Sequence, residues 1–77
     1  KPEFIKWAYD NNLWLQVEDD VKREEFHYHF VTEYAMSLET LEEKETLIAD
    51  YILEMDYLEK PDFAEKGRDL LKELIAQ

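Results

Sequence analysis

Turn-forming residues are scarce in this chain, whose 77 residues include one glycine and two prolines. Sheet folds place glycine, asparagine or proline at most of their turns, whereas helices joined by short loops need few such residues. Leucine, glutamate and lysine, which favour helices, are abundant. The scarcity of turn residues therefore predicts an all-α fold.

Apolar spacing and helix-terminating residues predict four helices, at about residues 2–11, 18–35, 41–58 and 63–76. Pro2 suits a first helical position, and the acidic residues at 18–20 suit the positive end of a helix dipole. Between them, residues 13–17 are expected to form a buried connector that is either extended or continues the first helix.

Two capping boxes are predicted at the starts of the last two helices. Thr40 and Glu43 have the required spacing, and so do Asp62 and Glu65, which follow a chain break expected at Pro61. We therefore expect a reciprocal side-chain to backbone cap at each start.

The predicted architecture is one domain, residues 1–77, folded as a compact bundle of three longer helices and one short N-terminal helix. With 45% hydrophobic and 14% aromatic residues, the chain is too apolar to stay disordered. A chain this small buries only about 60% of its unfolded surface, so a partner or a second copy in a homodimer would add stability.

The charge of the chain is negative and uneven. The net charge is -11, and residues 33–59 hold nine acidic residues against Lys44 alone. Such a chain repels nucleic-acid phosphates and anionic membranes, so we expect direct binding to neither. No apolar run approaches the roughly 20 residues that span a bilayer. The absence of cysteine favours a reducing, cytoplasmic location.

Both histidines lie in the stretch EEFHYHFVTEY, residues 24–34. On a helix His27 falls within the apolar stripe, and His29 points about 200° away, so the two cannot share a metal. Glu24 and His27 have the spacing found in di-iron bundles, but a second such pair would have to come from a symmetric dimer. We assign His27 to helix packing and expect its burial to lower its pKa.

Gly67 lies within the apolar stripe of the fourth predicted helix. Glycine costs about 1 kcal/mol of helix propensity relative to alanine. We therefore predict close approach of another helix at Gly67, either the third helix or a symmetry mate.

Enzymes use a nucleophile with a base, a metal cluster or a phosphate-binding glycine loop. This chain has no cysteine, one serine at Ser37, and histidines expected on different faces. We predict no enzymatic activity and no cofactor, and we assign no catalytic or metal-binding residue.

The third predicted helix carries an acidic outer face that includes Glu43, Asp50 and Glu54. Their spacings of seven and four residues correspond to about 10 and 6 Å along a helix axis, which resembles the step between phosphates in a nucleic-acid strand. The alternative interpretation is a solvated face that only keeps the protein soluble.

Apolar residues outside the core stripes are expected to form a contact patch with these acids: Leu53, Tyr57, Trp14 and Tyr28. The leading hypothesis is a small interaction or regulatory module that binds a basic protein partner through this surface. One alternative is an inhibitor, of phage type, that imitates DNA and blocks a nucleic-acid-binding protein. A second is a structural subunit that assembles with itself.

Overall fold

The computed structural model describes residues 2–77 and contains the expected helices. They are α1 (Pro2–Asp10), α2 (Asp20–Ser37), α3 (Leu41–Tyr57) and α4 (Pro61–Ala76), with a 3-10 turn, η1 (Leu13–Gln16), after α1. No β-strand occurs in residues 2–77. The predicted all-α fold of three longer helices and a short N-terminal helix is confirmed.

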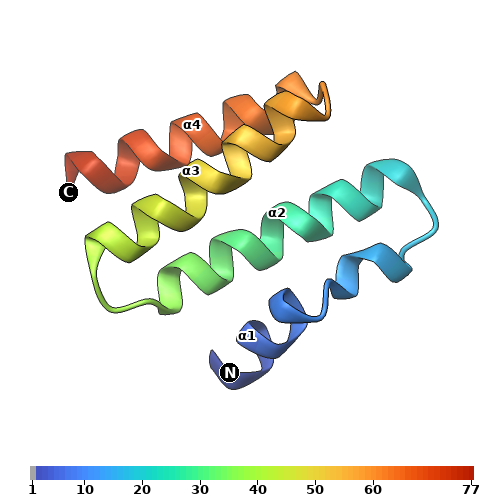
Figure 1. The fold of residues 1–77 in the computed structure, drawn as a ribbon, viewed down its shortest axis with the longest axis horizontal. Helices are drawn as coiled ribbons and strands as arrows, with labels where there is room; N and C mark the ends of the chain where they lie inside the picture. The colour runs from blue at the N-terminus through green and yellow to red at the C-terminus, as the bar shows by residue number, and fades with distance from the viewer. Residues whose placement is uncertain (1) are drawn as a thin grey trace.

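The helices lie side by side in chain order, with α3 between α2 and α4 and with α1 and η1 along the outer edge of α2 (Figure 1). The molecule measures 35 × 29 × 15 Å, so it is flat. Its radius of gyration, 12.1 Å, is close to the roughly 11.5 Å expected for a compact chain of this length. None of these helices, within residues 2–77, is both long and apolar enough to cross a membrane.

Two helix starts follow from local side-chain chemistry. The Asp19 carboxylate accepts a hydrogen bond from the Lys22 backbone N–H at the start of α2, at 2.9 Å. At the start of α3, Thr40 Oγ1 accepts from the Glu43 N–H and Glu43 Oε1 accepts from the Thr40 N–H, each at 3.1 Å. The first predicted capping box is therefore confirmed.

The second predicted capping box, Asp62 with Glu65, is wrong. Pro61 occupies the first position of α4, and the residue before it, Lys60, makes no side-chain cap. Because proline has no N–H and a backbone angle already suited to helix, it begins α4 instead of preceding it. Asp62 consequently lies inside the first turn.

The connector between α1 and α2 is neither extended nor a continuation of the first helix. Asn12 adopts a left-handed conformation, with φ 51°, and separates α1 from η1. Asparagine tolerates this region better than most residues do. η1 then packs on α2 with Trp14 buried, and the chain reverses after η1, before α2 begins (Figure 1).

The core runs along both sides of α3 in two adjoining clusters. The first contains Val31, Tyr51, Met55 and Ala64, and the second contains Ala35, Ile48, Ile52 and Leu74. Gly67 of α4 faces α3 so closely that a Cβ atom there would lie 2.7 Å from Ile52 Cγ1. The close approach expected at this glycine is thus observed, and the neighbouring helix is α3.

Candidate functional site

The outer face of α3 carries two large apolar side chains that are mostly exposed to solvent. Leu53 is 67% exposed and Tyr57 is 86% exposed. They are four residues apart and therefore neighbours on the helix surface. Asp50 and Glu54 are exposed on the same face. We call the four residues Asp50, Leu53, Glu54 and Tyr57 the α3 outer face.

No basic side chain of α3 reaches this face. Lys44, the single base of α3, donates from Nζ to the carbonyl oxygens of Ala35 at 3.1 Å, Met36 at 3.3 Å and Leu38. The ammonium thus binds the C-terminal end of α2, where the helix dipole is negative. Within residues 2–77, neither Asp50 nor Glu54 forms an ion pair.

Glu43, the third predicted acidic contact, is hydrogen-bonded to Thr40 within the chain. Its Oε1 accepts hydrogen bonds from the backbone N–H and from Oγ1 of Thr40, at 3.1 and 2.9 Å. The side chain is exposed, but this carboxylate holds the start of α3 in place. Of the three predicted acidic contacts, Asp50 and Glu54 are therefore the two that form neither a cap nor an ion pair within residues 2–77.

Trp14 does not belong to an exposed contact patch. Its side chain is 7% exposed, and its ring stacks on His27 with 4.1 Å between centroids and 5° between planes. The 3-10 turn η1, which follows the left-handed Asn12, buries the indole against α2, and the sequence pattern did not indicate this. The predicted exposure of Trp14 is therefore wrong, and its role in partner binding stays a prediction.

Tyr28 lies away from the α3 outer face. It is half-buried, packs on Tyr51 with ring centroids 5.9 Å apart, and has the Lys66 ammonium 5.6 Å above its ring. These neighbours place Tyr28, a residue of α2, against α3 and α4. Its role in partner binding stays a prediction, but the structure does not bring it together with Leu53 and Tyr57.

The two histidines are separated as predicted, with His27 only 4% exposed and His29 exposed. Nδ1 of His27 lies 3.6 Å from Glu24 Oε1, and the ring meets the Tyr51 ring edge-on at 5.1 Å between centroids. Burial lowers the pKa of His27, although the Glu54 and Glu24 carboxylates favour its charged form. Residues 2–77 contain no group of three or more acidic or histidine side chains that could hold a metal ion.

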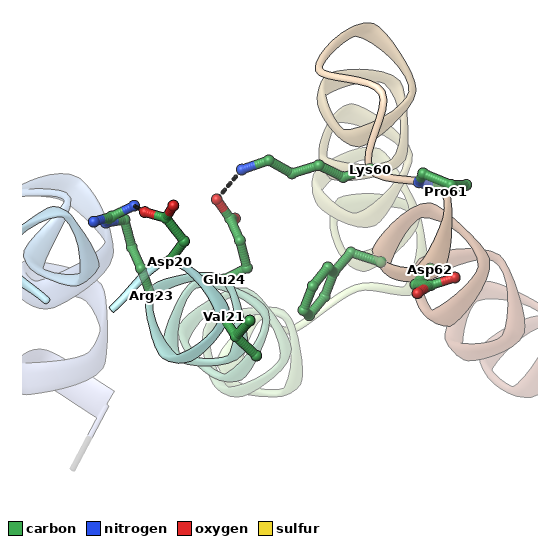
Figure 2. Close-up of a pocket in the computed structure, with 8 residues that line it drawn as sticks. Asp20, Val21, Arg23, Glu24, Lys60, Pro61 and Asp62 are labelled. Carbon is green, nitrogen blue, oxygen red and sulfur yellow. Dashed lines mark hydrogen bonds and ion pairs between the residues drawn. The ribbon is translucent and has the colours of Figure 1, made fainter. Parts of the chain in front are cut away.

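A surface pocket of about 420 Å³ lies where the start of α2 meets the start of α4 (Figure 2). It is lined by Asp20, Val21, Arg23, Glu24, Lys60, Pro61, Asp62 and Phe63. Lys60 binds Glu24 across it, and Arg23 binds Asp20 at 2.7 Å. Since both basic residues of the pocket are already paired, it has few polar groups left to orient a small ligand.

Sequence reasoning missed this pocket and a pair of aromatic rings on α1. Phe4 and Trp7 are each about half exposed, with ring centroids 6.2 Å apart. Their spacing of three residues was the available signal, because such residues lie on one side of a helix. The Lys60–Glu24 contact joins residues 36 apart in the sequence, and no local pattern indicates it.

The comparisons with known proteins leave this geometry as the basis for a functional interpretation. Protein families, curated proteins and solved structures were compared with the chain, and no match was found in any of the three.

Proposed function

We propose that this protein is a small interaction module that binds a basic protein partner through the α3 outer face. The observation that supports this most strongly is the exposure of Leu53 and Tyr57 beside two carboxylates, on a face that Lys44, the single base of α3, does not reach. Left in water, these side chains add little to folding, whereas burying them against a partner would yield about 25 cal/mol for each Å² of apolar surface.

Electrostatics supports a basic partner. The protein carries a net charge of -11, and Asp50 and Glu54 border the apolar pair directly. Lysine and arginine on a partner would be attracted over roughly 8–10 Å at physiological salt, which raises the association rate and orients the encounter. Acidic partners would be repelled by the same field.

The test uses the protein immobilised at low salt and exposed to native lysate. Wild-type protein is compared with Leu53→Ser/Tyr57→Ser and with Ile75→Ser, in which an aliphatic residue exposed to 60% on α4 is replaced. All three sites are exposed, so these changes should alter folding stability by no more than about 0.5 kcal/mol each. We expect a basic protein that the wild type and Ile75→Ser retain, that the double variant loses, and that high salt releases.

Binding by the purified partner then gives the magnitude. We expect Leu53→Ser/Tyr57→Ser to raise Kd by about tenfold or more, since buried aromatic contacts cost over 1 kcal/mol when truncated. Asp50→Asn/Glu54→Gln should act mainly by slowing association at low salt. Equal retention of the partner by the double variant would reject this face as the binding site.

A second candidate function is imitation of DNA, supported by the carboxylates of Asp50 and Glu54, which form no ion pair within residues 2–77 and lie about 6 Å apart along α3. It requires that the captured partner bind nucleic acid and that duplex DNA displace this protein from it. If duplex DNA does not reduce binding of the partner, DNA mimicry is rejected, whereas the interaction-module proposal is unaffected. Self-assembly, the third hypothesis, predicts a mass that rises with concentration in light scattering.

A further inference from the structure

Residues 2–17, which we call the N-terminal arm, pack on the rest of the fold through α2. The arm comprises α1, η1 and the link to α2, and lies along the outer edge of α2 (Figure 1). Within residues 2–77 it makes no extensive contact with α3 or α4, so its removal from α2 would leave the contacts among α2, α3 and α4 in place. Within the arm Ala8 and Trp14 are buried, while Phe4, Trp7 and Leu15 remain exposed. Trp14 is therefore the main apolar anchor.

The Trp14 ring covers a titratable group. It lies parallel to the His27 imidazole at 4.1 Å, and His27 is 4% exposed. On another side the imidazole meets the edge of Tyr51. An imidazolium needs water or full charge compensation, so hydration of a charged His27 requires one of the two rings that cover it, Trp14 or Tyr51, to move.

The charged groups around His27 offer it only partial compensation. Glu24, on the same helix, lies 3.6 Å away but already binds Lys60 from the loop before α4. Glu54 of α3 also favours the charged form, and Lys60 opposes it. Burial is the largest of these effects, so the pKa of His27 is lowered. Tyr51, the remaining titratable neighbour, is neutral, because burial raises the pKa of its phenol.

We propose that the N-terminal arm is a pH-sensitive element that leaves α2 when His27 is protonated, while α2, α3 and α4 stay folded. The docked arm holds His27 neutral, and the released arm lets it hydrate. The extended backbone at Val17 and Asp19 joins the arm to α2, and Arg23 holds this link by donating to the carbonyl oxygens of Val17 and Glu18, each at 2.8 Å. Release would uncover Phe30 and Tyr34, whose rings now contact Trp14 at 6.3 Å and Tyr9 at 4.9 Å. An apolar surface on α2 would thus become available at low pH.

Linkage sets the expected size of the effect. With His27 hydrated, its pKa should return to about 6.5. Because the docked state binds the proton less readily, the ratio of released to docked arms should rise by up to about tenfold per pH unit. This rise begins as pH falls below about 6.5 and ends below the lowered pKa of the docked state.

The ratio of released to docked arms can be measured by amide hydrogen exchange, even when the released state is a small fraction of the molecules. Exchange is followed by NMR at pH 7.5, 6.5 and 5.5 and corrected for intrinsic rates. We expect protection of α1 amides to fall by up to about tenfold per unit below pH 6.5, with protection in α3 and α4 unchanged. His29→Gln, which replaces the exposed histidine, should behave as wild type. His27→Gln should abolish the pH dependence.

A fluorescence measurement provides a second readout. Trp7→Phe leaves Trp14 as the single tryptophan, and its emission should shift to the red over the pH range in which α1 amides lose protection. If His27→Gln fails to fold, NMR titration of the wild-type imidazoles decides, because arm release must follow His27 and not His29. Three results would overturn the proposal: pH-independent α1 protection, the same pH dependence in His27→Gln, or parallel loss of protection in α3 and α4.

Discussion

Replacing Gly67 with alanine sets two physical effects of known sign against each other. Alanine favours a helix interior over glycine by about 1 kcal/mol. Against this, the new Cβ would lie 2.7 Å from Ile52 Cγ1 and 3.4 Å from Tyr51 Cδ2. The Ile52 side chain is stiff at its first torsion within a helix, so α4 must move away from α3. Such overpacking typically costs about 1–3 kcal/mol.

The expected net result is a loss of about 1 kcal/mol in the free energy of unfolding, measured by urea denaturation. For a domain of this size that corresponds to a fall in Tm of about 4–8 °C. The exposed residue Glu65 on the same helix supplies the control. The difference in stability between Glu65→Ala and Glu65→Gly measures the alanine preference of α4 without any packing term, and it should be about 1 kcal/mol.

A double-mutant cycle with Ile52→Ala isolates the contact. Ile52→Ala alone should destabilise by about 2–5 kcal/mol, because it opens a cavity in the core. In that background Gly67→Ala should become stabilising by up to about 1 kcal/mol, since the obstructing atom is gone and the new methyl group fills space. A different result would refute this account: Gly67→Ala stabilises the wild-type protein by as much as Glu65→Ala exceeds Glu65→Gly in stability. The close approach of α4 to α3 would then impose no energetic cost on a Cβ at residue 67.

Three further changes test single interactions. Thr40→Ala removes the α3 cap and should lower stability by about 1 kcal/mol, whereas Thr40→Ser should keep most of it; equal urea midpoints for all three proteins would contradict the cap. Lys44→Met removes the ammonium from three carbonyl oxygens at the end of α2 and should cost about 1 kcal/mol in thermal unfolding; an unchanged Tm would show that water replaces it. The pKa of His27 is lowered, so its contribution to the free energy of unfolding should be greatest above pH 6.5 and be lost as pH falls below that value. Urea denaturation between pH 7.5 and 5.5 should show this loss in the wild type and not in His27→Gln. The same dependence of unfolding free energy on pH in both proteins would refute it.

Local patterns predicted the fold well where neighbours in sequence are also neighbours in space. The Thr40 and Glu43 cap spans three residues, and the helix bounds follow from apolar spacing to within about two residues. The burial of His27 and the exposure of Leu53 and Tyr57 also follow from their positions around a helix. Partner binding by Leu53 and Tyr57 stays a prediction.

The errors have two physical sources. Asp62 matched the capping-box pattern, but Pro61 can begin a helix without any side-chain cap. Local sequence alone does not show which of these two helix starts is the more stable. The burial of Trp14 was not predicted, because the direction of its side chain depends on the 3-10 turn after Asn12 and on the packing of η1 against α2. The ion pair of Lys60 with Glu24 joins distant segments, so it follows only from the packing of complete helices.

The flat arrangement explains why a small acidic helical protein keeps so much apolar surface. Helices laid side by side, in a body 15 Å across its shortest axis, bury the edges that face their neighbours and leave both broad faces open. The accessible surface of 5489 Å² accordingly exceeds the roughly 5,000 Å² expected for a folded chain of this mass. In the middle helix, α3, the edges pack on α2 and α4, so Leu53 and Tyr57 have no neighbour to cover them. Their exposure therefore follows from the order of the helices, and a partner seated on α3 would supply the layer that the chain does not provide there.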